Sequence, residues 1–303
     1  MKILDEQYKE DITNRIIKAL EKGTAPWQRP WSINLPINAV TNKYYRGMNS
    51  IILDIKGGEF SEEQEEDRDQ RWATQKQAES QGWSIKSGAE PTKIYVLIIP
   101  KKTKRHSDRL NRDVFVVDKK SAFTKIFEVY HASQIKGIPP LVKCCRQQVI
   151  SNEMIDKIVF NASARIFEGG YEACYMHQSD VIKMPYKKYF NDTESYYSTL
   201  LHELVHWTGH SSRLERFFSW DRESEAYARE ELVAEIASMM LTHEVGITLT
   251  QKHFYNHAAY VASWISLLKS DTNAIFKATE DAQKAVNFIL AFQDDEEQEK
   301  ISA

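Results

Sequence analysis

The chain has 303 residues, of which 42% are hydrophobic and 27% charged, and its formal net charge at pH 7 is −3. These values are typical of a soluble globular protein of two domains, and no apolar run approaches the roughly 18 residues that a membrane span needs. The first residues lack the apolar core of a signal peptide, and three cysteines do not suffice for a disulfide framework. We therefore expect a cytoplasmic protein with reduced thiols and no membrane partner.

The net charge hides an asymmetry between the two halves of the chain. Residues 1–130 contain 23 lysines and arginines against 19 aspartates and glutamates, a net of +4, whereas residues 131–303 contain 17 against 24, a net of −7. The basic half is the candidate region for binding nucleic acid.

The chain begins with a predicted helix at residues 7–22, whose core face carries Ile12, Ile16, Ile17 and Leu20. A segment bounded by Pro26 and Pro30 follows, and its prolines keep it extended. It presents the candidate DNA-binding residues Trp27, Arg29 and Trp31. The tryptophans are candidates for stacking on bases, and the alternative is that they cap an edge of the core.

Residues 38–49 are predicted to form a strand, a turn and a short segment bearing Tyr44, Tyr45 and Arg46. Aromatic and basic residues interleave here, as in surfaces that bind single strands. Gly57, Gly58 and the acidic run 59–69 are predicted to form a polar loop, and residues 71–81 a helix.

A predicted hairpin pairs strands 94–99 and 114–117, and residues 127–130 close the sheet. The loop at 101–112 carries six lysines and arginines. Four of them are candidate phosphate contacts: Lys101, Lys102, Lys104 and Arg105. The alternative is a loop whose charges only keep the protein soluble.

Residues 135–140 contain a glycine and paired prolines and are the predicted linker between domains. A helix at 151–167 and two short antiparallel strands at 172–176 and 180–184 are predicted to follow. We expect strand 181–184 to be an edge strand that can accept a peptide backbone, and helices at 253–268 and 271–292 to complete the chain.

The stretch from Thr199 to His210 contains an H-E-x-x-H motif. It is predicted to lie on a helix with a capping box at Asn191 and Glu194 and an end at Gly209. His202 and His206 are one helical turn apart and can bind one metal ion, for which zinc is expected. Glu203 is the candidate general base.

A third ligand must come from elsewhere in the chain. Ser212 occupies the position where a metzincin has its third histidine, so that class is disfavoured. Glu231 and Glu235 share one face of a second predicted helix, so Glu231 is the candidate ligand and Glu235 a hydrogen-bond partner of a ligating histidine. We expect Glu230 to point to another face and to be solvated, and His210 remains the alternative ligand.

The E-x-x-A-E spacing at 231–235 resembles the E-x-x-A-D element of gluzincin peptidases. The segments 196–216, 227–235 and 257–264 resemble the zincin-like domain of ArdC-type antirestriction proteins, which are encoded on conjugative plasmids and related mobile elements. Segments 16–31, 38–41, 45–49 and 72–78 resemble the single-stranded-DNA-binding domain of that family, which plasmid TraC-type primases share.

We therefore predict an α+β protein: a mixed α/β single-stranded-DNA-binding domain at 1–136, a linker at 137–150 and a mainly helical zincin-like domain at 151–303. The resemblance implies an antirestriction function with a zinc-dependent peptidase site. One Zn²⁺ is the expected cofactor, with another divalent transition metal such as Mn²⁺ as the alternative. Expected partners are single-stranded DNA and an unknown peptide or protein substrate, for which a host restriction component is a candidate. Two alternative functions are a DNA-binding protein with a purely structural metal site and an accessory fragment of a primase.

Overall fold

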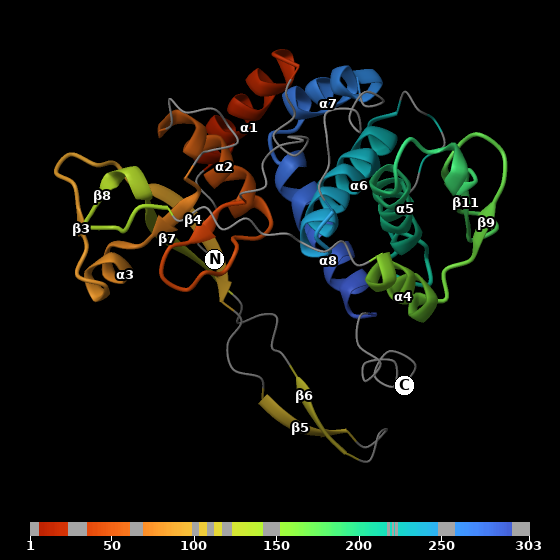
Figure 1. Ribbon diagram of the computed structural model, residues 1–303, viewed down its shortest axis with the longest axis horizontal. Helices are drawn as coiled ribbons and strands as arrows, with labels where there is room; N and C mark the ends of the chain where they lie inside the picture. Colours follow the sequence, from red (N-terminus) through yellow and green to blue (C-terminus); the bar gives the residue numbers. More distant parts are fainter. Residues whose placement is uncertain are drawn as a thin grey trace.

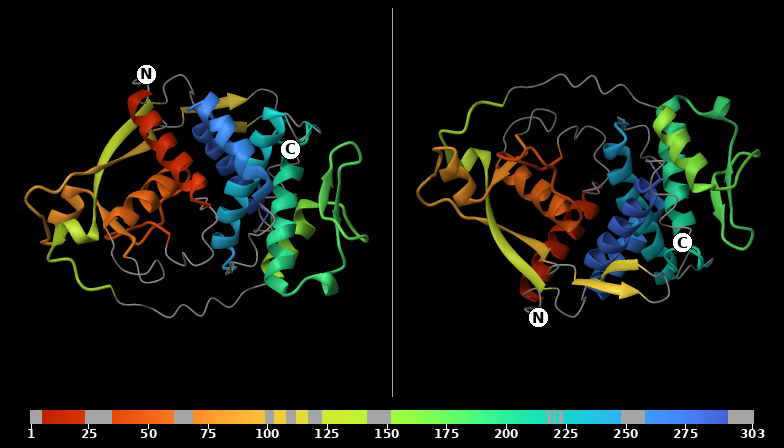
Figure 2. Two further views of the ribbon diagram at one scale, coloured as in Figure 1. Left: turned by 90° about the horizontal axis from the view of Figure 1, so that it is seen from above. Right: turned by 90° about the horizontal axis from the view of Figure 1, so that it is seen from below.

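The computed structural model describes residues 6–23, 35–60, 69–98, 103–107, 112–116, 123–141, 152–216, 219, 221, 224–247 and 258–292. Two halves lie side by side (Figures 1 and 2). One holds the main sheet with three helices from the first half of the sequence, and the other is a group of helices with a small sheet at its outer end. The fold is α+β, as predicted.

The main sheet has four strands in the order β1-β2-β7-β4. They are β1 (Ile37–Asn38), β2 (Arg71–Ala73), β4 (Thr92–Ile98) and β7 (Phe123–His131). The long antiparallel pairing of β4 with β7 means that the predicted hairpin partner of β4 was wrong. The basic stretch instead includes β5 (Thr103–Ser107), which pairs with β6 (Arg112–Val116) in a separate ribbon that projects from the body of the molecule (Figure 1).

Three further predictions in this half need correction. Gly57 and Gly58 lie inside helix α2 (Met48–Phe60), because its buried Ile51, Ile52 and Leu53 hold the helix on the core despite the two glycines. The helix predicted at 71–81 is strand β2 followed by α3 (Gln75–Ser80), which a capping box at Thr74 starts. The predicted linker begins with strand β8 (Ile135–Lys136), which pairs with β3 (Ser84–Ile85).

Helix α1 (Glu6–Glu21) confirms the first predicted helix, and all four of its predicted core residues are buried. These residues belong to the same core cluster as the helices of the second half, and α1 packs against α7. Thr13 donates a hydrogen bond from Oγ1 to the carbonyl of Thr272, at 2.9 Å. Most of residues 137–150 lie outside the described ranges, so the division into domains there stays a prediction.

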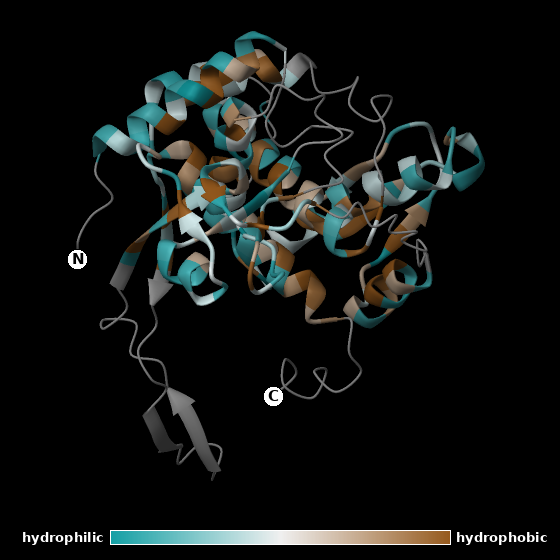
Figure 3. Cartoon of the chain, turned by 60° about the vertical axis from the view of Figure 1, so that its left-hand side comes forward, coloured by the Kyte–Doolittle hydropathy of each residue, from teal (hydrophilic) through white to brown (hydrophobic). Residues whose placement is uncertain are grey.

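The helical half contains α4 (Asn152–Ala162), α5 (Thr193–Thr208), α6 (Glu225–Glu244), α7 (Ala258–Ser270) and α8 (Ala274–Leu290). Helix α6 lies between α5 and α8 and contacts α7 as well (Figure 2). Trp264 is completely buried against it and donates its indole N–H to the carbonyl of Ala228. Hydrophobic residues gather in the interior, and hydrophilic residues cover the outer faces of the peripheral helices (Figure 3).

The small sheet at the outer end has the order β10-β11-β9. Strands β10 (Cys174–Met176) and β11 (Val181–Met184) are the predicted antiparallel pair, whereas β9 (Ile166–Glu168) was predicted as the end of a helix. Because β9 pairs with β11 in parallel, β11 is the central strand. The prediction that 181–184 is an edge strand was therefore wrong, and a peptide can pair only with β10 or β9. Among the described residues, no helix is long and apolar enough to cross a membrane.

Candidate metal centre

Helix α5 carries both histidines of the motif, with His206 buried and His202 partly exposed. Its N-cap is Asp192, whose side chain accepts a hydrogen bond from the backbone N–H of Ser195 at 2.7 Å, so the predicted cap at Asn191 is off by one residue. Leu200, Leu201, Leu204 and Val205 are buried and anchor the helix. Each such burial contributes roughly 1.5–3 kcal/mol. These buried residues therefore hold the helix, and with it the two histidines, in a fixed position.

Helix α6 supplies the third side chain and is buried on nearly every face. Its N-cap Ser224 accepts a hydrogen bond from the N–H of Tyr227, and its buried residues include Leu232, Val233, Ala234, Ile236 and Ala237. A helix that is buried all round has no solvated face for an acidic side chain. Any glutamate in this stretch must therefore have a polar partner inside the protein.

The structure brings His202, His206 and Glu231 together. Their potential ligand atoms all lie within 4.8 Å of one another. The two Nε2 atoms are 3.2 Å apart, and the Glu231 oxygens lie 3.7 Å from Nε2 of His202 and 3.6 Å from Nε2 of His206. Ligand atoms about 2.0–2.2 Å from a tetrahedral zinc ion are separated by roughly 3.3–3.6 Å. The three residues therefore fit a divalent metal without rearrangement.

The outer nitrogen of each histidine faces a carboxylate. Oε1 of Glu235 lies 3.6 Å from Nδ1 of His202, which is within ion-pair distance but beyond a hydrogen bond, so the predicted hydrogen bond stays a prediction. Oε1 of Glu230 lies 3.2 Å from Nδ1 of His206. The prediction that Glu230 is solvated was wrong: its side chain is 5% exposed because α6 is covered on that face too. A carboxylate on the outer nitrogen fixes which nitrogen faces the metal.

Arg216 is a second partner of Glu230, in addition to His206. It donates to both oxygens of Glu230, from Nη2 at 2.7 Å and from Nε at 2.9 Å. The same guanidinium donates to Thr208 Oγ1 at 2.8 Å and to the carbonyl of Val205 at 2.7 Å, so it also ties down the end of α5. A bidentate pair of this kind fixes orientation as well as charge.

These contacts set the protonation of the buried groups. Burial favours the neutral form of Glu230, but hydrogen bonds from Arg216 and then His206 outweigh it and lower the pKa of Glu230. Burial also opposes the charge on His206. The hydrogen bond to Glu230 and the charges of Glu231, Glu230 and Glu203 prevail and raise the pKa of His206 to about 9. Carboxylates therefore surround His206, and such an environment is suited to a cation.

Glu203 is buried on α5 near this cluster, and its negative charge also influences Cys174 on strand β10. Partial desolvation raises the pKa of the Cys174 thiol, and the charge of Glu203 raises it further. Helix α5, which carries the candidate base, contacts both β10 and β11 of the small sheet. His210, the alternative ligand, points elsewhere: its Nδ1 is 2.8 Å from Ser212 Oγ, and its ring lies 5.1 Å from that of His177.

A pair of tyrosines lies close to Glu231. The hydroxyls of Tyr227 and Tyr260 are 3.3 Å apart. Desolvation and the charge of Glu231 raise the pKa of Tyr227, so its hydroxyl stays protonated and can donate. Sequence reasoning missed Tyr227, although its i, i+4 spacing to Glu231 is a readable signal.

Only some of the predicted DNA-binding residues belong to the described part of the chain. Trp27, Arg29, Trp31, Lys101 and Lys102 lie outside the described residues, and for Lys104 and Arg105 only the backbone of β5 is described. Tyr45 is half-buried in the core of the first half, and its hydroxyl accepts a hydrogen bond from Asn38.

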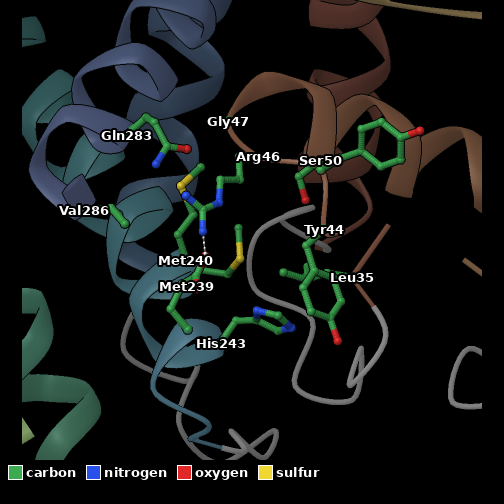
Figure 4. Close-up of a pocket in the computed structure, with 12 residues that line it drawn as sticks. Leu35, Tyr44, Arg46, Gly47, Ser50, Met239, Met240, His243, Gln283 and Val286 are labelled. Carbon is green, nitrogen blue, oxygen red and sulfur yellow. Dashed lines mark ion pairs between the residues drawn. The ribbon is translucent and has the colours of Figure 1, made fainter. Parts of the chain in front are cut away.

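Tyr44 and Arg46 face the second half across a small pocket (Figure 4). The ring of Tyr44 packs edge-on against His243 at a centroid distance of 4.6 Å. Arg46 forms an ion pair with Glu244, with 3.0 Å between Nη2 and Oε1. Both partners belong to the C-terminal end of α6, the helix that carries Glu231.

Two family models match the two halves of the chain. The family model of the N-terminal domain of anti-restriction factor ArdC matches residues 6–130, and that of a zincin-like metallopeptidase matches residues 153–281. The chain is 38% identical over 309 positions to DNA primase TraC of Escherichia coli, covering 97% of this chain but only 28% of that protein.

Two crystal structures of the antirestriction protein ArdC from plasmid R388 are similar over nearly their whole length, each at 31% identity. The metal-free structure has a TM-score of 0.70 and covers 94% of this chain and 97% of that one. The Mn(II)-bound structure has a TM-score of 0.72 and covers 95% and 98%.

Proposed function

The chain belongs to the ArdC family of antirestriction proteins, and on that premise we propose that it binds single-stranded DNA through its N-terminal half and hydrolyses a peptide bond at a zinc site in its C-terminal half. In this proposal it is encoded by a conjugative plasmid or a related mobile element and protects incoming DNA from restriction. It acts in the cytoplasm, where a thiol such as that of Cys174 stays reduced.

One observation carries the catalytic part: two histidines and a glutamate converge within 4.8 Å while Glu203 is buried on the same helix. His202, His206 and Glu231 would hold the metal, and Glu235 and Glu230 would orient the imidazoles. Zinc is proposed because three protein ligands of this type are typical of catalytic zinc. Manganese is the alternative, since an ArdC structure contains Mn(II). A bound divalent ion would supply Lewis acidity and lower the pKa of a bound water.

The chain's own residues supply the proton transfers. The carboxylate of Glu203 accepts a proton from the attacking water as the new C–O bond forms, and it returns that proton to the leaving nitrogen as the peptide C–N bond breaks. The protonated hydroxyl of Tyr227, beside Glu231, is placed to donate a hydrogen bond to the developing oxyanion. An extended peptide would pair with the free edge of β10, an edge strand that contacts the helix of Glu203.

Glu203→Gln tests this proposal, because it keeps the shape of the side chain but removes the base. The variant should retain metal, fold and affinity for single-stranded DNA while peptide hydrolysis falls about 10²–10⁴-fold. Metal content would be measured by mass spectrometry, and cleavage with denatured casein and purified restriction subunits. Glu194→Gln, in the first turn of the same helix, is the matched control and should behave as wild type.

Protection of incoming DNA in a conjugation assay separates the two activities. If Glu203→Gln protects as well as wild type, peptide hydrolysis does not provide the protection, and DNA binding by the N-terminal half must do so. Equal hydrolysis in wild type and Glu203→Gln would show that Glu203 is not the base.

The similarity to the TraC primase favours a second candidate function, in which the chain supports priming by holding the template strand. The chain spans under a third of that primase. A primer-synthesis assay with and without the chain distinguishes the two functions, because a peptidase leaves the priming rate unchanged.

A further inference from the structure

The exposed aromatic side chains of the described residues are confined to one part of the second half. Five aromatic side chains are exposed among the described residues, and all five fall between residues 160 and 189: Phe160, Phe167, Tyr171, Tyr186 and Tyr189. The exposed large apolar residues of the main sheet, Val96 and Ile126, are aliphatic. Concentrated exposure of this kind marks an interaction surface.

Three of the tyrosines form a contiguous group. The rings of Tyr171 and Tyr189 are stacked, with centroids 5.9 Å apart and an interplanar angle of 24°. Tyr186 meets Tyr189 edge to face at 5.8 Å. Tyr171 follows β9, whereas Tyr186 is the N-cap of the 3-10 helix η4 (Lys187–Tyr189) and Tyr189 is its last residue. Tyr171 is 88% exposed, so one ring face of the stack remains open to a planar ligand.

Two lysines accompany these rings. Nζ of Lys188 lies 5.5 Å from the centroid of Tyr186 and 5.4 Å from that of Tyr189. Lys183 pairs with Phe167 across β11 and β9, and its side chain runs along Gly170, where an added Cβ would lie 3.2 Å from its Cε. We call Phe167, Tyr171, Lys183, Tyr186, Lys188 and Tyr189 the tyrosine–lysine patch.

The composition of the patch distinguishes between possible occupants. A protein interface core combines aromatic with other apolar side chains and is depleted in lysine. The exposed aliphatic residues that the structure describes belong to other elements: Val96, Ile126, Leu141 and Met154. Open aromatic faces next to ammonium groups are instead the composition that holds single-stranded nucleic acid, with bases on the rings and phosphates on the lysines.

We propose that the tyrosine–lysine patch is a second binding surface for single-stranded DNA, located on the zincin-like half. The proposal rests on the proposed function in one respect, that the protein binds a single strand at all. Glu168 and Glu172 lie in the same stretch as the two lysines, so the patch has little excess positive charge. Stacking therefore dominates its affinity, and its contribution depends only weakly on salt.

The test measures binding of the full chain to a fluorescent oligothymidylate and to a duplex of equal length. The double variant Tyr171→Ser/Tyr189→Ser should bind the single strand at least about fivefold more weakly, the loss of one base stack. The slope of affinity against salt should not change. Tyr171→Phe/Tyr189→Phe should restore the affinity, because it keeps the rings.

Phe160→Ser is the matched control, since Phe160 is 81% exposed on α4 and outside the patch. It should bind as wild type, and all variants should unfold at the same temperature. Wild-type affinity in the serine double variant would overturn the proposal while leaving DNA binding by the N-terminal half intact. If wild type itself binds no single strand, the proposed function fails together with it. Unchanged strand affinity with lost protection in conjugation would assign the patch to a protein partner instead.

Discussion

The metal centre and the predicted DNA-binding segments of the first half differ in how their residues are held. At the metal centre, each candidate ligand is fixed by a helix, and the outer nitrogen of each histidine meets a carboxylate. Tyr44, Tyr45 and Arg46 lie between β1 and α2, and each contacts other protein residues, while the Arg46 side chain is 61% exposed.

The two regions differ because helical spacing in a sequence fixes geometry, whereas composition does not. Helical spacing fixes the relative positions of His202 and His206 before any tertiary contact forms. Interleaved aromatic and basic residues predict a type of surface, but they do not say which ring is open. In the described part of the chain, the open rings lie on the other half.

The largest expected effect is the loss of metal binding when the third candidate ligand is removed. Glu231→Ala should abolish stoichiometric binding of Zn²⁺ or Mn²⁺, because only two protein ligands remain. His210→Ala should keep full occupancy, since His210 is directed toward Ser212. Mass spectrometry of the purified proteins measures both. Full metal in Glu231→Ala together with loss in His210→Ala would reverse the ligand assignment.

A tenfold to hundredfold effect on metal affinity is expected from Glu230, the carboxylate that faces the candidate ligand His206. Glu230→Gln keeps the side-chain volume but removes the negative charge that faces His206 and Arg216, so metal affinity should fall about 10–100-fold. Chelator competition measures the affinity, and thermal unfolding reports the cost of leaving Arg216 without its charged partner. Glu244→Gln changes a glutamate at the far end of the same helix and should leave metal affinity unchanged. Equal affinities in all three proteins would show that Glu230 has no part in orienting His206.

The smallest expected effects are those on DNA binding of changing Arg46 and its partner Glu244. Arg46→Ala should weaken single-strand binding slightly for all sequences and lower the salt slope by about one, if Arg46 contacts a phosphate. Its exposed ion pair with Glu244 contributes only roughly 0.2–1 kcal/mol, so DNA can displace it. Glu244→Gln should then bind DNA as well as wild type or better. An unchanged salt slope in Arg46→Ala would leave Arg46 as a purely structural contact between the halves.

The sequence by itself determined the elements with strong periodicity. The apolar spacing of α1 and the spacing of His202, His206, Glu231 and Glu235 predicted which residues turn inward. The structure confirms the burial of the α1 face and brings these four side chains together. These features depend on a 3.6-residue repeat, which one helix expresses without reference to the rest of the chain.

The contacts between elements could not be predicted from the sequence and became known from the tertiary structure. The partner of β4 is β7, strand β11 is central, and Glu230 is buried against Arg216, all against expectation. Strand pairing depends on register and connection, which a single strand does not encode. The environment of Glu230 depends on which elements cover that face of α6. A glutamate has the same spacing whether water or a buried arginine meets it, and only the packed fold distinguishes the two.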